Sequence, residues 1–339
     1  MGWRHAETLL CFGIGNEDPV RASYNLALRL CCVCVGVLAS TARADIGIRD
    51  FADTILTDDP EPNDQFVGPT VTWQRFGTTE EGSPTSQIDL GFEIEKRITP
   101  RLSIQLGYGG SIVTIPGDSA RGGFQNLSLG LQYEIFRSAP HEFIVSLGVA
   151  REFGNTGSTR VGAEQTGTTT PLVFVGKGFG DLLPISFLRP LALTGEFGYA
   201  FADKVLKGPL STADDRTSVA GADSNGGLEH RWVGGFTLQY PLGYLDNELL
   251  SRHFPEWLDN ITPLVEFVWS SPATSPSNTR TQWIIAPGII WSNQWYQFGV
   301  EALIPGNGAS GKGIGMIAQF RMALGVIAPA LNRPIFGRP

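Results

Sequence analysis

The chain has 339 residues, enough for one large domain or two ordinary ones. Its formal net charge of −8 argues against a nucleic-acid-binding surface. It contains no run of about eighteen uncharged apolar residues, which argues against a helical membrane protein. The composition instead combines 42 glycines and 22 prolines with a mean hydropathy near zero. A mean hydropathy near zero is expected when strands alternate apolar and polar side chains, because the two kinds cancel in the average.

The N-terminus carries the features of an export signal. An apolar core, Leu30–Ala39, follows Arg21 and Arg29 and precedes Ala42-Arg43-Ala44, which matches an A-x-A cleavage site. We therefore expect export and cleavage before Asp45. A single membrane anchor is the alternative, although the apolar core is too short for a span.

The candidates for enzyme chemistry are few. All four cysteines, Cys11, Cys31, Cys32 and Cys34, precede the expected cleavage site. The mature chain would therefore have no disulfide, no thiolate metal site and no cysteine nucleophile. The remaining histidines, His141, His230 and His253, lack a zinc-like spacing. We expect no catalytic residues, no metal site and no cofactor, and hence no enzyme.

From Gln65 onward, apolar and polar residues alternate with a period of two, which is typical of strands. The alternation is strict in three segments: Ile88–Glu95, Leu102–Ile112 and Leu127–Ile135. It is weaker in nine others: Val67–Phe76, Phe143–Arg151, Pro171–Phe179, Leu191–Tyr199, His230–Tyr240, Ile261–Ser270, Thr281–Trp291, Tyr296–Ile304 and Ile314–Met322. Because neighbouring strand residues point to opposite faces, each segment has one apolar and one polar face. The pattern predicts about twelve strands.

The connections between these strands alternate in length. Three are short: Lys96–Arg101, Arg137–His141 and Ser292–Gln294. Three on the opposite side are long and rich in Gly, Thr, Ser and Asp: Gly77–Thr85, Phe153–Thr170 and Ala200–Gly227. Membrane barrels have short turns at the inner end and long loops at the outer end. Two longer inner connections, Gly180–Pro190 and Pro241–Asn260, break the rule, and Asn247–Leu258 could form a short helix in the second.

Aromatic residues gather near the expected strand ends. Those near the outer ends are Trp73, Tyr199, Trp232, Trp269 and Trp283, and those near the inner ends are Tyr133, Tyr240, Trp291 and Trp295. Membrane barrels carry such girdles at both interfaces, whereas core aromatics of a soluble sandwich would gather mid-strand. We therefore predict an all-β fold, a closed antiparallel transmembrane β-barrel. The predicted divisions are a leader and signal peptide (1–44), a periplasmic segment (45–64), the barrel (65–323) and a C-terminal extension (324–339).

Two stretches resemble a known family. The first is Gly176-Lys177-Gly178-Phe179-Gly180-Asp181, with Leu188–Glu196 after it, and the second is Gly313–Phe320, followed by Arg333–Gly337. Both resemble segments of outer-membrane barrels grouped with the transporters named after the meta pathway of phenol degradation. The resemblance covers about the last half of the chain. It implies a barrel fold and a transport role, but no substrate-binding residue carries over.

The parity of the strands places seven charged residues on the polar, lumen-facing side. They are Glu93, Glu134, Glu196, Arg231, Glu266, Glu301 and Arg321. They could form a charged constriction that selects solutes, or they could pair and fill the barrel. We expect a passive outer-membrane channel for small solutes, with lipid as its surroundings and no nucleic acid as a partner. The alternative is a non-conducting structural or adhesive barrel that binds a partner through its long outer loops.

Overall fold

The computed structural model describes residues 51–76, 85–182, 185–205, 228–249, 255–273 and 280–337. The expected signal peptide and the cleavage site before Asp45 lie outside these ranges. Most of the outer loop predicted at Ala200–Gly227 also lies outside them.

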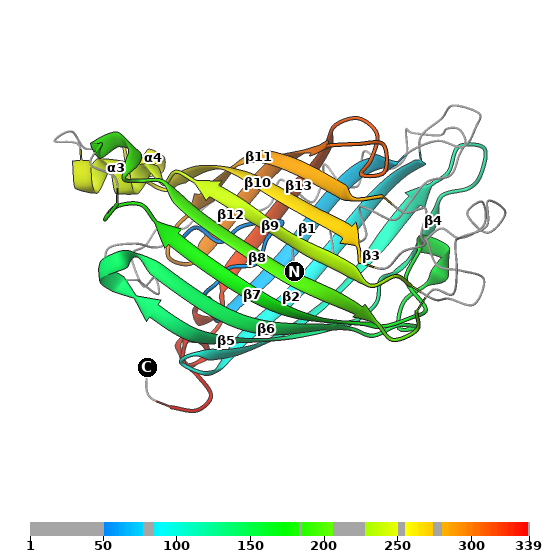
Figure 1. Ribbon diagram of the computed structural model, residues 1–339, viewed down its shortest axis with the longest axis horizontal. Helices are drawn as coiled ribbons and strands as arrows, with labels where there is room; N and C mark the ends of the chain where they lie inside the picture. Colours follow the sequence, from blue (N-terminus) through cyan, green and yellow to red (C-terminus); the bar gives the residue numbers. More distant parts are fainter. Residues whose placement is uncertain are drawn as a thin grey trace.

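Twelve long strands close into a ring (Figure 1). They are β1 (Gln65–Phe76), β2 (Thr85–Thr99), β3 (Leu102–Thr114), β5 (Ser128–Ser138), β6 (Phe143–Glu152), β7 (Thr168–Gly178), β8 (Ala192–Ala202), β9 (Arg231–Gln239), β10 (Ile261–Pro272), β11 (Gln282–Ser292), β12 (Tyr296–Pro305) and β13 (Gly315–Ala323). Each strand pairs antiparallel with the next in this order, and β13 pairs with β1. The predicted fold class, a closed antiparallel barrel of about twelve strands, is confirmed.

The sequence did not predict a thirteenth, short strand, β4 (Arg121–Phe124). It pairs only with the outer half of β3, whose inner half pairs with β5. Its sequence, Arg-Gly-Gly-Phe, is too short and too rich in glycine to show alternation. The strict segment Ile88–Glu95 also extends further, to Thr99, because backbone pairing with β3 continues past the apolar residues.

Two short helices lie at the inner end of the barrel, α3 (Leu242–Leu249) and α4 (Glu256–Asp259) (Figure 1). They overlap the single helix predicted at Asn247–Leu258. The C-terminal extension runs along the same end, where the amide of Phe336 donates to the carbonyl of Ile98 at 2.8 Å. The described ranges also contain 3₁₀ turns: η1 (Ala139–His141), η2 (Thr159–Val161), η3 (Ser186–Leu188), η4 (Leu324–Val326) and η5 (Pro329–Asn332). Within the described ranges, no helix is long and apolar enough to cross a membrane.

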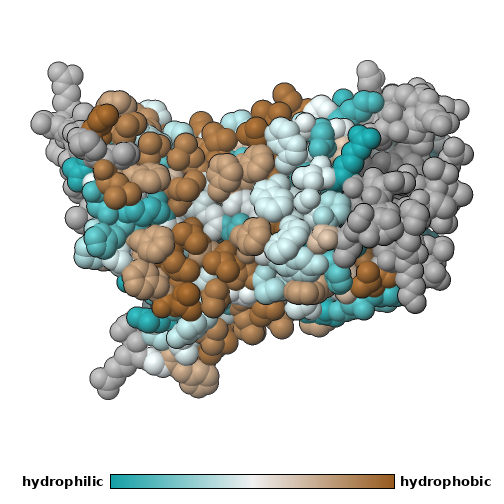
Figure 2. Space-filling model, viewed as in Figure 1, coloured by the Kyte–Doolittle hydropathy of each residue, from teal (hydrophilic) through white to brown (hydrophobic). Residues whose placement is uncertain are grey.

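The outer face of the barrel is apolar around its middle. Leu90, Leu106 and Leu131 are 42%, 48% and 40% exposed, whereas the strand neighbour Asp89 is 3% exposed. Figure 2 shows apolar side chains gathered over the strands, with hydrophilic side chains toward both ends. Aromatic rings meet near the outer strand ends, as where Tyr199 contacts Trp232 edge-on at a centroid distance of 4.6 Å. The apolar side chains of these strands thus face outward, whereas in a soluble sandwich they face the core.

The interior has two kinds of wall. One side, formed by β1, β2, β3 and β5, is polar and carries buried Thr, Gln, Ser, Asp and Glu side chains. The other side, formed by β10 to β13, carries an apolar cluster that consists of Leu264, Val268, Ile284, Ala286, Ile290, Leu303 and Ile317, together with Phe76 from the outer end of β1 and with Ile55 and Leu56. The last two residues precede the first strand, so a part of the chain outside the strands completes the core of the barrel.

This observation corrects one expectation. Residues 45–64 were expected to form a periplasmic segment, but residues 51–64 lie inside the ring of strands, where they are largely buried (Figure 1). The physical reason is that inward-facing side chains of the wall hydrogen-bond the main chain of this stretch. We call residues 51–64 the N-terminal segment.

Candidate functional site: a lumen filled by the N-terminal segment

The seven charged residues predicted for the lumen lie on inward-facing strand positions. Six of them are no more than 8% exposed, namely Glu93, Glu134, Glu196, Glu266, Glu301 and Arg321, and Arg231 is half-buried. They do not form one ring. Glu196, Glu266 and Arg321 contact the N-terminal segment. Glu93 and Glu301 lie near the middle of β2 and β12, and Glu134 and Arg231 lie toward the two ends of the barrel.

Glu266, in the middle of β10, is the central acceptor for the N-terminal segment. Its carboxylate accepts hydrogen bonds from the amides of Ile55 at 2.6 Å, Leu56 at 3.1 Å and Thr57 at 2.8 Å. The Thr57 hydroxyl donates a fourth at 3.0 Å. A carboxylate that accepts several amide hydrogen bonds makes strong, charge-assisted contacts. Glu266 therefore fixes the turn of the segment at mid-lumen.

Arg321, near the inner end of β13, is the central donor. Its guanidinium donates to Asp59 Oδ2 at 3.1 Å, to Gln319 Oε1 at 2.6 Å and to the carbonyl of Thr54. A second carboxylate of the segment, Asp53, lies 3.6 Å away. Burying a guanidinium is tolerated when it is paired and its donors are used, and the segment supplies both conditions.

Further wall residues bind the main chain of the segment. Gln239 contacts Ala52 twice, accepting from its amide at 3.0 Å and donating to its carbonyl at 2.9 Å. The other contacts are Gln297 to the Asp53 carbonyl, Gln132 to the Asp59 carbonyl, Ser146 to the Pro60 carbonyl, the Asp58 amide to Glu196 and the Asn63 amide to Glu95. With Glu266 and Arg321, these contacts come from eight strands: β2, β5, β6, β8, β9, β10, β12 and β13. The segment thus touches most of the circumference of the lumen.

Three glycines of the wall leave room for the segment. A β-carbon on Gly299 would lie 2.6 Å from Ile55 Cδ1, and one on Gly235 would lie 2.6 Å from Thr57 Cγ2. One on Gly176 would lie 2.9 Å from Pro60 Cγ. Contacts this short do not occur between real side chains, so the missing side chains create sockets for the segment.

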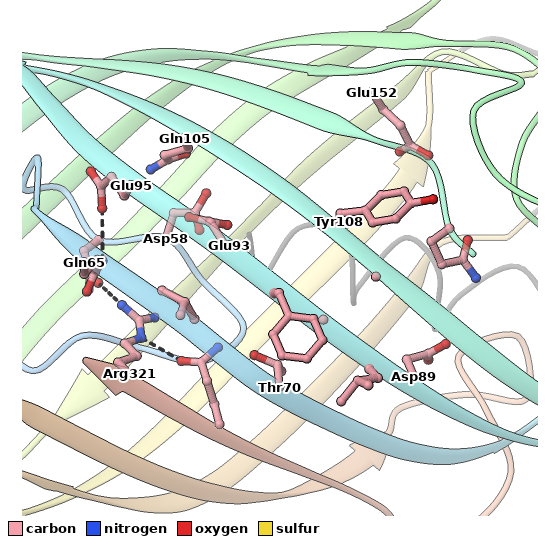
Figure 3. A pocket seen from close by; sticks show the side chains of 18 of the residues that line it. Asp58, Gln65, Thr70, Asp89, Glu93, Glu95, Gln105, Tyr108, Glu152 and Arg321 are labelled. Carbon is pink, nitrogen blue, oxygen red and sulfur yellow. Dashed lines mark hydrogen bonds and ion pairs between the residues drawn. The ribbon is translucent and has the colours of Figure 1, made fainter. Parts of the chain in front are cut away.

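Two cavities border the segment. The larger, of about 420 Å³, opens at the inner end between the segment, the α3 region and the strand ends of β10 to β13. The smaller, of about 70 Å³, extends along β1, β2 and β3, and its wall includes Asp58, Asp89, Glu93, Glu95 and Arg321 (Figure 3). Asp59, Glu61, Gln65 and Arg321 line both cavities. The two cavities therefore adjoin at these residues.

The remaining predicted lumen residues have partners of their own or lie apart. At the inner end, Glu134 accepts from Arg137 Nε at 3.0 Å. At the outer end, Arg231 Nε donates to Ser270 Oγ at 2.6 Å. Glu301 is buried on β12, on the inward face next to Gly288. Strand parity alone does not show which of these residues meet.

The outer rim carries a separate ion pair. Arg151 Nη1, at the end of β6, donates to Asp203 Oδ1 at 2.7 Å, and Nη2 donates to the second oxygen. These hydrogen bonds lower the pKa of the Asp203 carboxyl below its ordinary value. Because the pair is exposed, it contributes little to the free energy of unfolding of the barrel.

The candidate metal-binding and hydrolytic residues of the sequence can be placed only in part. In the part of the chain that the structure describes, no group of three or more His, Cys, Asp or Glu side chains could hold a metal ion. His230 Nδ1 accepts from the amide of Ala202 at 3.1 Å, which is a structural contact. The nearby Ser224 and Asn225 lie outside the described residues.

Comparison with known proteins gives fold likenesses only. No protein-family profile and no curated sequence matches the chain. Among solved structures, an outer-membrane channel of the COG4313 group from Pseudomonas putida F1 aligns with a TM-score of 0.46 and 11% identity, over 78% of this chain and 97% of that one. The NanC porin aligns at 0.44 and 9% identity, and the KdgM porin at 0.39 and 9%; each covers 75% of this chain and 98% of its own. Likenesses at these values do not establish a common function.

Proposed function

We propose that the protein is an outer-membrane channel for small solutes. The observation that carries this proposal is the combination of a closed ring of twelve strands, an apolar belt on its outside and a polar wall within. A bilayer admits only structures whose backbone hydrogen bonds are all satisfied, and a closed barrel meets that condition. The sequence resemblance to meta-pathway transporters implies the same class. Export with cleavage before Asp45 is part of the proposal, and the mass of the membrane-extracted chain tests it.

One observation favours the alternative, a non-conducting structural barrel that binds a partner through its outer loops. The N-terminal segment occupies the middle of the lumen and contacts eight strands. A barrel closed permanently in this way would have no transport role. Single-channel recordings of the refolded protein in planar bilayers separate the two functions, because only the channel shows discrete openings.

If the lumen conducts, we expect it to prefer cations modestly. The lumen holds an excess of carboxylates over guanidinium groups, and buried negative charge raises the local concentration of cations, most strongly at low salt. Changing Glu93, Glu134 and Glu196 together to Gln is expected to shift the reversal potential across a salt gradient toward zero. Glutamine keeps an acceptor oxygen, so the contact between Glu196 and the Asp58 amide can survive.

The matched control is Asp118→Asn, which removes a charge from an exposed loop and is expected to leave the reversal potential unchanged. An unchanged reversal potential in the triple variant would show that these glutamates do not line the conducting path.

A further inference from the structure

We propose that the N-terminal segment is a removable plug, which closes the channel while Glu266 and Arg321 hold it and opens the channel when it leaves the lumen. This inference rests on the proposed channel function and adds its regulation. It depends on three features of the segment. The wall fits it closely, it has no helix or strand that pairs with the wall, and it carries negative charge like the wall around it.

The wall of the lumen matches the segment in shape and in its hydrogen-bonding groups. The glycine sockets at Gly176, Gly235 and Gly299 admit Pro60, Thr57 and Ile55, and Ile55 and Leu56 complete the apolar cluster of the barrel. Most of the hydrogen bonds run from wall side chains to main-chain atoms of the segment. Since the contacts come from eight strands, the segment crosses the lumen at mid-height and obstructs the path of a solute.

The attachment is nevertheless local and separable. Residues 51–64 contain neither helix nor strand, so no backbone ladder joins them to the wall. Each contact is a single side chain that can exchange its partner for water or solute. The segment could therefore detach without breaking any strand pairing of the barrel, with Gln65 as its hinge.

The charge balance favours release. The segment carries five carboxylates, Asp53, Asp58, Asp59, Glu61 and Asp64, and no basic residue. The wall around it is also acidic, with Glu93, Glu95, Glu196, Glu266 and Glu301. At the inner end Lys96 and Arg97 pair with Asp64, and Arg137 pairs with Glu61. Deeper in the lumen, Arg321 is the buried cation that faces Asp53 and Asp59. Like charges repel strongly in a low-dielectric interior. Even with these pairs, carboxylates outnumber the cations around the segment, so repulsion between like charges lowers the free energy needed to release it.

The experiment compares ion flux through the full-length protein and a variant without residues 51–64, both reconstituted in liposomes. If the segment closes the lumen for about nine-tenths of the time, its removal raises the flux about tenfold, because flux follows the open fraction. A synthetic peptide of residues 51–64, added to the deletion variant, is expected to close it again in a saturable manner. The control peptide has Ser in place of Ile55 and Leu56 and is expected to have little effect.

A second pair of variants keeps the whole chain. Gly299→Leu fills the socket of Ile55 and is expected to raise the flux as the deletion does. Combining it with Ile55→Gly restores the space and is expected to restore closure, which shows that any gain in flux does not come from a damaged barrel.

The outcomes separate the two proposals. High flux only after deletion or after Gly299→Leu, with closure by the peptide, supports the plug. Equal flux through full-length and deleted protein overturns the plug and leaves the channel standing. No flux through any variant, with folding verified by heat-modifiable migration in gels, overturns the channel and the plug together.

Discussion

Replacing Arg321 by Met is expected to destabilise the barrel more than any other single change in the lumen. Asp59 would keep its buried position and lose its cationic partner, and the carbonyl of Thr54 would lose its donor. Removing one partner of a buried pair costs about 3–5 kcal/mol, because the other charge is left uncompensated. Urea titration of the protein in detergent micelles, followed by tryptophan fluorescence, measures this loss in the free energy of unfolding.

The control is Arg231→Met at the outer end of the same interior. Arg231 is half-buried, donates to Ser270 and lies 3.5 Å from the carboxylate of Glu229, so its loss is expected to cost about 1.5–3 kcal/mol, less than the loss of Arg321. The Arg321 variant should also expose residues 51–64 to protease, whereas the control should not. Equal stability of the two variants would contradict the role given to Arg321.

The second large effect is expected on the outer surface. Leu106→Arg places a charge on the apolar belt, where Leu106 is 48% exposed to what we propose is lipid. A charge at the bilayer midplane costs about 2–4 kcal/mol of barrel stability. The measurement is the free energy of unfolding from lipid vesicles.

The adjacent residue offers a matched control. Gln105 points the other way and lines the smaller cavity, which is rich in carboxylates. Gln105→Arg is therefore expected to cost much less than Leu106→Arg. If the two variants lose the same free energy in vesicles, or if Leu106→Arg loses none, the belt does not face lipid.

The strands could be predicted because the barrel wall imposes a period of two on the sequence. Leu90 and Asp89 show why: adjacent residues face lipid-like and interior surroundings, so their polarity must differ. Weaker alternation in β10 and β11 also has a cause. Val268 and Ile284 face inward, yet they are apolar because they pack against Ile55 and Leu56.

The filling of the lumen could not be predicted in the same way. Residues 51–64 have no periodicity, because their contacts are made one at a time to different strands. The only sequence signal was the presence of Phe51, Ile55 and Leu56 in an otherwise acidic stretch. Strand parity gave the face of Glu266 and Glu134, but it could not show that one binds the segment and the other binds Arg137.

A reversible lock tests the central claim most directly, that this barrel is a channel closed by its own N-terminal segment. The hydroxyl oxygens of Thr57 in the segment and Thr237 in β9 lie 2.7 Å apart, and no native cysteine follows Cys34. With both threonines changed to Cys, the oxidised protein is expected to show no openings in a planar bilayer, and reduction in the same bilayer is expected to restore the openings of the unmodified chain. Openings through fully oxidised protein would contradict the account.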